Sequence, residues 1–227
     1  MASKNIIKEL TRNKREVIIA FSSHSDDWVI GAGGTLAKYA QEGKKVIIVI
    51  FSYGEKSHPW LKEEVIQKMR SREAFHAGEV VDCEIVFFDL EEVKFEEGYK
   101  SKNIGQELLA LLEKEQPTKL FTHCEEDLHP DHNAVHKITL ELWSKLPSKH
   151  RPEVYTYPVW NPVNFHTKYP SLYIDITSTF SSKLNAIKAF HSQKFHIIYP
   201  VLLLLFRAVK DGIKIRKKFG EQFFRIR

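Results

Sequence analysis

Two short polar clusters in this chain contain the residue types that hold metal ions and move protons. The first, "SSHSDDWVIGAGG", spans Ser22–Gly34 and follows the apolar run Val17–Phe21. The second, "THCEEDLHPDH", spans Thr122–His132 and begins at the end of another apolar run. His24 and Asp27 are three residues apart, as are His129 and His132. In a loop or a first helical turn this spacing puts both side chains on the same side, so each pair can offer ligands to a common point.

Two histidines and a carboxylate commonly hold a hydrolytic divalent metal with positions left open for water and substrate. The donor set favours zinc, with ferrous iron as the second choice. Attack by the metal's water on a carbonyl also needs a base and a group that stabilises the oxyanion. Asp26 can be the base, and whichever histidine is not a ligand can be the acid or the oxyanion partner. Asp131 can hold that histidine in the required tautomer.

Each cluster also has a simpler interpretation. Asp26 and Asp27 can cap a helix, and the HPDH sequence can form a surface turn. Two such clusters at the ends of two strands favour one shared site instead. A dinucleotide-binding loop is disfavoured because the third glycine of its pattern would fall on Leu36. No GxSxG turn is present to expose a serine nucleophile.

Apolar, β-branched runs alternate with segments of helical spacing, which predicts an α/β fold: a Rossmann-like three-layer α/β/α architecture with a mostly parallel sheet. In such sheets ligands bind beyond the carboxyl ends of the strands, where both clusters lie. The predicted strands are Val17–Phe21, Val46–Phe51, Ile85–Leu90, Lys119–Thr122, Val154–Tyr157 and Leu172–Ile176. The predicted helices are Thr35–Glu42, Leu61–Val81, Asn103–Glu115, His132–Leu146, Ser182–Phe190 and Val201–Phe219.

The composition of the 227 residues is that of a globular protein, with 43% hydrophobic and 28% charged residues. A single domain over residues 1–227 is expected. Cys83 and Cys124 cannot form a disulfide framework, and the first residues do not resemble a secretory signal, so a cytoplasmic protein is expected. The longest apolar run, Ile197–Phe206, is too short to span a membrane.

The net charge of +5 comes from the last part of the chain. Arg207–Arg227 holds eight Lys or Arg and two acids, a net of +6, so the preceding residues carry −1. A basic C-terminal helix at about residues 201–227 is expected. Its charge suits an anionic lipid surface or nucleic acid, although the solvated face of a terminal helix is the simpler interpretation.

Further stretches give the sequence a resemblance to a known family. "HSDDWVIGAGGTLAKYAQEGKKV" and "EDLHPDH" resemble the two signatures of the LmbE/PIG-L-like metal-dependent N-deacetylases. "FSYGE", the Arg70-Ser-Arg-Glu-Ala segment, "YIDIT", Ser192-Gln193 and the terminal "FGEQF" also match. The resemblance extends over nearly the whole chain. Ser25 and Trp28 depart from it, because family members usually have proline and an acid at these positions.

The resemblance implies a zinc-dependent hydrolase that removes acetate from an N-acetylglucosamine-type sugar or glycoconjugate. It implies metal ligands at His24, Asp27 and His132, and Asp26 as the general base. His129, oriented by Asp131, would stabilise the oxyanion and assist the leaving amine. Arg70 would grip substrate, and Asp89 is a weaker match to a sugar-contacting acid.

The resemblance also bears on the end of the chain and on partners. It implies that the run Val201–Phe206 packs against the core, and a peripheral contact of the basic tail with anionic membrane is a hypothesis. Nucleic acid is not expected as a partner, and an oligomer is compatible with the sequence. His123 and Cys124 are expected to be packing residues at the strand end.

Two other functions remain open. One is a different metal-dependent hydrolase on the same site, and the other is a catalytically idle module that binds a sugar or nucleic acid. Substrate specificity is expected in the loops at residues 55–61, 91–101 and 158–170.

Overall fold

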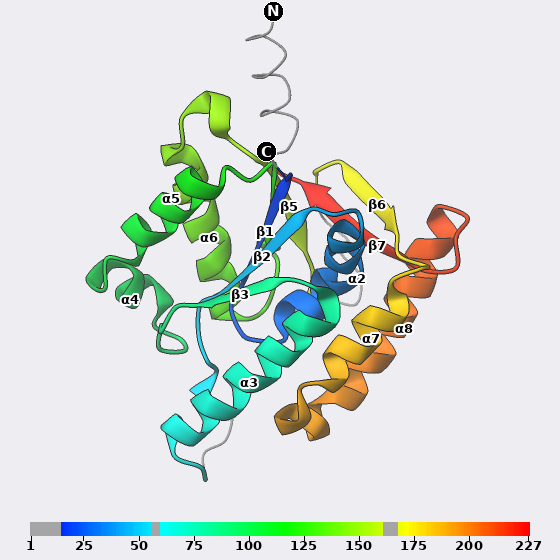
Figure 1. Cartoon of the computed structure of the whole chain (residues 1–227), viewed down its shortest axis with the longest axis horizontal. Coiled ribbons are helices and arrows are strands. Elements are labelled where there is room, and N and C mark those ends of the chain that lie inside the picture. The colour runs from blue at the N-terminus through cyan, green and yellow to red at the C-terminus, as the bar shows by residue number, and fades with distance from the viewer. Residues whose placement is uncertain (1–14, 56–59, 161–167) are drawn as a thin grey trace, which may run out of the picture.

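The computed structural model describes residues 15–55, 60–160 and 168–227, and of residues 194–200 the backbone alone. Within these ranges the chain forms the predicted three-layer α/β/α fold around a seven-stranded sheet (Figure 1). The strand order across the sheet is β3-β2-β1-β4-β5-β7-β6. The strands are β1 (Val17–Ser22), β2 (Lys45–Ile50), β3 (Glu84–Phe87), β4 (Lys119–His123), β5 (Glu153–Tyr157), β6 (Ser171–Asp175) and β7 (Gly220–Arg225).

The first five strands pair in parallel, with β1 between β2 and β4. Every residue of β1 is buried, because helices cover both faces of the sheet at its centre. This explains why β1 is a continuous apolar run rather than an alternating one. The centre of the sheet is thereby fixed by hydrophobic packing on two sides, and the loop after β1 starts from a rigid base.

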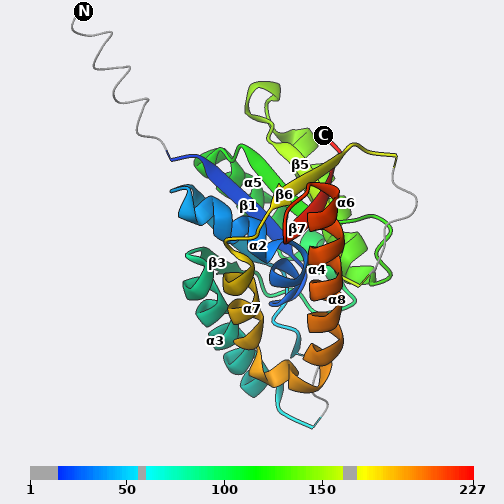
Figure 2. The ribbon, with the colours of Figure 1, turned by 90° about the vertical axis from the view of Figure 1, so that its right-hand side faces the viewer.

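The two faces of the sheet are covered by separate groups of helices (Figure 2). One core contains Ile18 and Ala20 of β1, and the other contains Ile19 and Phe21. The first core is covered by α2 (Asp27–Gln41), α3 (Glu63–Val81), α7 (Phe180–Lys188) and α8 (Lys194–Lys214). The second is covered by α4 (Phe95–Ser101), α5 (Ile104–Glu115) and α6 (Pro130–Lys145). The short 3-10 turns are Ser148–His150 and His191–Gln193.

The end of the chain differs from the predicted helix at residues 201–219. The helix α8 already ends at Lys214, and Gly220–Arg225 forms β7, which pairs antiparallel with both β5 and β6. Phe223 and Phe224 are buried in this strand, so it belongs to the interior of the sheet. In the sequence, basic residues stand before and after this strand, so Phe223 and Phe224 were not recognised as part of a strand.

The expectation that Val201–Phe206 packs against the core is wrong for half of that run. Leu203 and Leu204 are buried, whereas Leu202, Leu205 and Phe206 are exposed. A helix that lies on a protein surface can bury only one of its faces, and this one has apolar residues on both. No helix among the described residues has the length and hydropathy needed to cross a membrane.

A buried ion pair connects the last strand to the middle of α2. The carboxylate of Glu221 in β7 accepts hydrogen bonds from the backbone N–H groups of Gly34 and Thr35 at 3.0 and 2.8 Å. Lys183 of α7 lies 2.6 Å from the same carboxylate and donates to the carbonyl oxygen of Ile30 at 2.9 Å. Three elements are thus joined behind the loop that follows β1.

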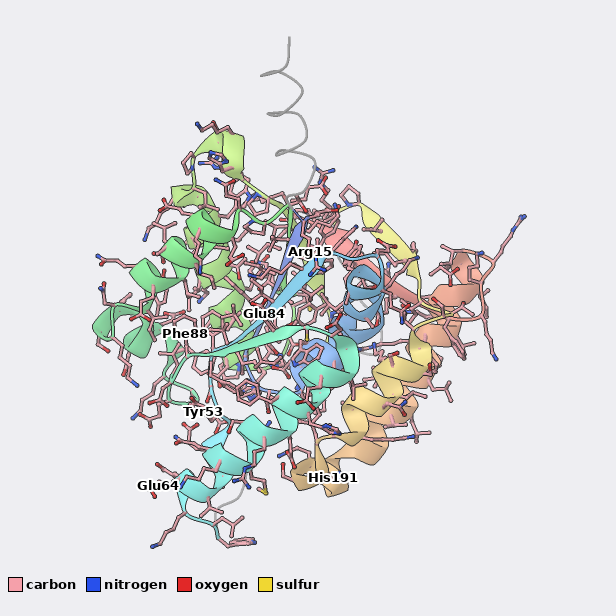
Figure 3. All side chains as sticks on the ribbon, in the orientation of Figure 1. Arg15, Tyr53, Glu64, Glu84, Phe88 and His191 are labelled. Atoms are coloured by element: carbon pink, nitrogen blue, oxygen red, sulfur yellow. The ribbon has the colours of Figure 1, made fainter. Side chains whose placement is uncertain are left out.

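The five parallel strands β1 to β5 all run away from the side of the molecule near Arg15. Figure 3 shows Arg15, just before β1, on one side, and Tyr53, Glu64 and His191 together on the other. The carboxyl ends of β1, β2 and β4 therefore lie on the same side of the molecule as the start of α3 and the His191 turn. Both polar clusters of the sequence lie on this side.

Candidate active site

The loop between β1 and α2 is closed by its own polar side chains. The hydroxyl of Ser22 donates to the carbonyl oxygen of His24 at 2.6 Å and accepts from the N–H of Trp28 at 3.2 Å. The N–H of His24 donates to Asp27 Oδ2 at 2.8 Å. These bonds fold the loop into one tight turn, so that the side chains of His24 and Asp27 point to the same place. Trp28, fully buried, points into the core instead of lining the site.

Three side chains from the two clusters converge on one point, as the sequence predicted. Nδ1 of His24 lies 3.3 Å from Asp27 Oδ2, and Nε2 of His132 lies 3.2 Å from the same oxygen. All three residues are buried. Their candidate ligand atoms lie within 4.8 Å of one another, close enough to bind one ion. His132 reaches this point because α6 begins at Pro130 and presents the residue in its first turn.

Each of the two histidines has a carboxylate at its other ring nitrogen. Asp127 Oδ1 lies 2.9 Å from Nδ1 of His132. Asp131 Oδ2 and Glu92 Oε1 lie 3.3 and 3.4 Å from Nε2 of His24. Carboxylates in this position hold a ligating imidazole in one tautomer and orientation and make it more basic. Asp127 and Glu92 were not among the residues predicted from the sequence, although both are acids within or next to polar loops at strand ends.

The charges at this site shift the ionisation of its members strongly. Burial alone would lower the pKa of His24, but the carboxylates of Asp131 and Asp27 raise it to about 10. For His132, burial is likewise outweighed by Asp27 and Asp127, which raise its pKa to about 9. Burial raises the pKa of Asp27, yet the charge of His132 brings it well below the usual range. The site is therefore built around a concentrated negative charge that attracts cations.

The donor set fits a divalent metal. Among the described residues, Nε2 of His132 is buried and lacks a hydrogen-bond partner of acceptable geometry. A buried nitrogen of this kind needs a partner, and a metal ion is one that imidazole and carboxylate can share. Two nitrogens and one carboxylate oxygen suit zinc or ferrous iron better than magnesium or calcium, which prefer oxygen ligands alone.

Asp26 lies beside this point and contacts Arg70 rather than a histidine. Nη2 of Arg70 lies 3.3 Å from Asp26 Oδ1, and its Nε and Nη2 donate to the hydroxyl of Ser25 at 3.1 and 3.0 Å. Ser25, a departure from the family sequence, thus supplies an acceptor that holds the arginine. Burial raises the pKa of Asp26, although Arg70 opposes the shift. A carboxylate with a raised pKa is better suited to accept a proton.

His129 lies next to the two predicted ligand histidines, with its ring centroid 5.0 Å from that of His24 and 4.9 Å from that of His132. It is the N-cap of α6, and its Nδ1 accepts a hydrogen bond from the backbone N–H of Asp131 at 3.2 Å. Burial and the neighbouring histidine charges lower its pKa. The neutral ring therefore carries its hydrogen on Nε2 and can donate it.

The expected contact between the Asp131 carboxylate and His129 is replaced by a different one. Asp131 Oδ2 lies 3.9 Å from Nδ1 of His129, beyond hydrogen-bond distance, and the carboxylate accepts from the N–H of Val93 at 2.9 Å instead. The backbone N–H of Asp131, rather than its side chain, sets the tautomer of His129. The side chain is directed to His24.

The two residues expected to pack at the end of β4 are both buried. Nε2 of His123 accepts a hydrogen bond from the N–H of Ser23 at 2.9 Å, which ties the end of β4 to the loop after β1. Its ring stacks on that of His132 with centroids 4.0 Å apart. Burial brings the pKa of His123 well below its usual value, and burial also raises the pKa of Cys124 to about 12.

Asp89 contacts none of the converging side chains in the described contacts. Its side chain is 68% exposed and contacts Lys102 at 3.6 Å. The acid that does reach the site from this segment is Glu92, three residues later. It precedes Val93, which has a positive φ of 68°. The sharp turn that this backbone requires was not visible in the sequence because valine rarely adopts it.

Known proteins resemble this chain over most of its length. It is 24% identical to a probable N-acetyl-α-D-glucosaminyl L-malate deacetylase 2 of Bacillus cereus, over 79% of this chain and 84% of that protein. It is 26% identical to the 4-oxalmesaconate hydratase of Pseudomonas putida, over 89% of this chain and 82% of that protein. In structure it is similar to the N,N'-diacetylchitobiose deacetylase of Pyrococcus horikoshii, with a TM-score of 0.74, 22% identity and coverage of 97% and 91% of the two chains.

A family model also matches residues 19–143, a stretch that begins in β1 and ends in α6. This stretch includes both polar clusters, and with them every residue that converges on the candidate metal point. The chain therefore belongs to the PIG-L family, whose model is described as GlcNAc-PI de-N-acetylase.

Proposed function

We propose that this protein is a cytoplasmic, zinc-dependent hydrolase that removes the N-acetyl group from an N-acetylglucosamine-type sugar or glycoconjugate. The convergence of His24, Asp27 and His132 from two distant segments is the observation that carries this proposal. Membership in the PIG-L family and similarity to a protein named as a glucosaminyl-malate deacetylase support the substrate class.

In this proposal His24, Asp27 and His132 hold zinc, and Asp131 and Asp127 orient the two histidines. Zinc in this place would polarise the amide carbonyl and lower the pKa of the attacking water. The buried Asp27 supplies the negative charge that balances the ion. Glu92, which also faces His24, keeps that ring fixed from the other side.

The proton of the attacking water is taken by Asp26, whose pKa is raised by burial. As the carbonyl oxygen gains negative charge, Nε2–H of His129 donates a hydrogen bond to it. The proton on Asp26 then passes to the amide nitrogen as the carbon–nitrogen bond breaks, with His129 assisting the leaving amine. The products are acetic acid and a free amine, and the proton that the acid releases on ionising to acetate is taken up by the amine or by solvent, so atoms and charge balance.

Arg70 is proposed to bind substrate, and it also holds Asp26 in place. A guanidinium that already contacts the base couples recognition of the sugar to the position of the proton acceptor. The loops expected to give specificity lie partly outside the described residues, at 56–59 and 161–167.

Acetate release tests this proposal. The zinc-loaded protein is incubated with N-acetylglucosamine derivatives, both free and as glycoconjugates, and acetate and free amine are measured. The variant Asp26→Asn should retain its zinc and lose about 10²–10⁴-fold in kcat. Asp89→Asn, which lies outside the site, is the matched control and should keep full activity. Full activity of Asp26→Asn would show that another group is the base.

A second candidate is hydration of a carbon–carbon double bond in a substrate of the 4-oxalmesaconate kind. It is favoured by the 26% identity to the hydratase of Pseudomonas putida, which extends over more of this chain than the identity to the deacetylase does. The same metal and base can add water to a carbon–carbon double bond as well as to a carbonyl. Loss of the absorbance of 4-oxalmesaconate without acetate release from any N-acetyl sugar would favour this candidate over the first.

A further inference from the structure

The helix α8 is apolar on its exposed face as well as on the face that packs against the protein. Its exposed face carries five large apolar residues, which we call the α8 stripe: Leu202, Leu205, Phe206, Val209 and Ile213. Phe206 is 55% exposed and Ile213 is 69% exposed. At 3.6 residues per turn the five fall within an arc of about 100°. A surface helix normally presents polar residues to solvent, so this arrangement is not explained by the fold.

Two charged residues of the same helix, Arg207 and Asp211, turn toward the protein. Arg207 is buried and donates to the carbonyl oxygens of Pro158 and Val159 at 3.1 and 2.9 Å. Asp211 is also buried. The inner face of α8 therefore makes specific polar contacts. The orientation is fixed, and the stripe is held outward.

Basic residues adjoin the stripe on one flank and at its C-terminal end. Lys210 and Lys214 lie on α8 beside the stripe, and the turn that follows carries Arg216, Lys217 and Lys218. Asp211 is the only acid between Lys194 and Phe219, and it is buried. Lys217 has a neighbouring acid, with Asp175 at 3.5 Å. The exposed surface along α8 is therefore apolar and cationic at once.

We propose that the α8 stripe is a surface for peripheral binding to an anionic phospholipid bilayer. Apolar side chains on one face of a helix enter the boundary between headgroups and acyl chains, and adjacent lysines contact the lipid phosphates. Figure 2 shows α8 along one side of the molecule, with its first residues at the edge where the strands end and its last residues at the opposite edge.

A bilayer fits this surface better than a second copy of the chain. Pairing of two α8 stripes would bring two cationic flanks together, and neither α8 nor the turn after it has an exposed acid to neutralise them. An anionic membrane supplies both the apolar phase and the opposite charge. This inference concerns binding alone and does not depend on the proposed reaction.

Vesicle flotation of the full chain tests the inference without any substrate. Vesicles of phosphatidylcholine alone are compared with vesicles that also contain phosphatidylglycerol. The protein should float with the anionic vesicles, weakly or not at all with the neutral ones, and less as salt is added. Equal behaviour on both kinds of vesicle would overturn the proposal.

Two pairs of substitutions locate the contact. Phe206→Gln with Ile213→Gln should reduce binding by about tenfold or more, and Lys214→Glu with Lys218→Glu should do so as well. The matched control is Val65→Gln with Phe75→Gln, two apolar residues of α3 that are half exposed; it should bind as the wild type does. Circular dichroism verifies that each variant is folded.

Sedimentation equilibrium distinguishes the remaining outcome. The wild type and the variant with Phe206 and Ile213 replaced are expected to have the same molecular mass in solution. A dimer that dissociates on these replacements, together with no preference for anionic vesicles, would show that the stripe binds a second copy and would overturn the proposal.

Discussion

Asp127 Oδ1 lies 2.9 Å from Nδ1 of His132, on the opposite side of the ring from the nitrogen that faces Asp27. The carboxylate also accepts a hydrogen bond from the N–H of His129 at 3.1 Å. One buried acid therefore orients a candidate metal ligand and fixes the backbone of the neighbouring candidate acid. The turn before α6 is organised around this residue.

Replacement of this acid should weaken metal binding without removing a ligand. Asp127→Asn is expected to lower zinc affinity by about 10–100-fold, because the imidazole of His132 loses the partner that orients it and makes it basic. Competition with a chromophoric chelator measures the affinity. Asp89→Asn serves as the control and should bind zinc as the wild type does. Unchanged affinity in Asp127→Asn would contradict the role given to this residue.

Removal of the metal should lower thermal stability reversibly. A ligand that binds only the folded state stabilises it by about 4 kcal/mol when its concentration is 1,000 times its dissociation constant. We expect treatment with a chelator to lower Tm and zinc to restore it. The variant Asp27→Asn should not respond to zinc, because it lacks the shared carboxylate. Identical melting of the wild type with and without zinc would argue against a metal at this site.

The buried pair between Lys183 and Glu221 should be costly to break from one side. Lys183→Met leaves a buried carboxylate without its countercharge, and the expected loss of unfolding free energy is about 3–5 kcal/mol. The matched control is Lys137→Met, which breaks an exposed pair with Glu96 at 2.9 Å. That loss should be below about 1 kcal/mol. Urea denaturation measures both losses of unfolding free energy. Equal losses would show that burial does not make the pair of Lys183 and Glu221 more costly to break.

The buried carboxylate of Asp211 should give a stability difference that depends on pH. Burial raises its pKa above 3.8 in the folded protein, so folding favours the protonated form. That contribution is complete below the pKa of the unfolded state and is lost as pH rises through the folded pKa. Asn imitates the protonated acid, so Asp211→Asn should gain stability relative to the wild type as pH rises from 3.8 through the folded pKa of Asp211.

A second aspartate provides a control of opposite sign for this experiment. Hydrogen bonds from Thr177 lower the pKa of Asp175 below 3.8, so its ionised form stabilises the fold above the unfolded pKa. Asp175→Asn should therefore lose stability relative to the wild type as pH rises from below the folded pKa of Asp175 to above 3.8. Urea titrations at each pH give both differences. Parallel pH dependence in the two variants would contradict the assigned causes.

The parts of the fold that were predicted correctly are those with simple local signals. The run Val17–Phe21 is apolar at every position because β1 is covered on both faces, and such a run is easily recognised. The convergence of His24, Asp27 and His132 follows from a rule of parallel sheets, whose loops at the carboxyl ends meet at one edge. The spacing of these residues and the topology of a parallel sheet were enough to predict that they converge.

The parts that were missed depend on the exact path of the chain. Asp89 and Glu92 are both acids in one loop, and only the backbone turn at Val93 decides which of them faces His24. The strand β7 was hidden because its apolar pair stands among charged residues, two of which, Glu221 and Arg225, have partners elsewhere in the fold. The family resemblance implied that Val201–Phe206 packs against the core, but the sequence did not show which of the two apolar faces of α8 does so.

The position of β7 has a consequence for how the molecule is synthesised. β6 reaches the rest of the sheet only through β7, which lies between it and β5. Translation delivers residues 171–175 well before residues 220–225. During that interval the edge of β5 is open and β6 has no neighbour, so a nascent chain exposes unpaired strand edges of the kind that chaperones protect. The sheet is therefore complete only after the last of these strands has left the ribosome. The hydrogen bonds between Glu221 and α2 can form only then as well.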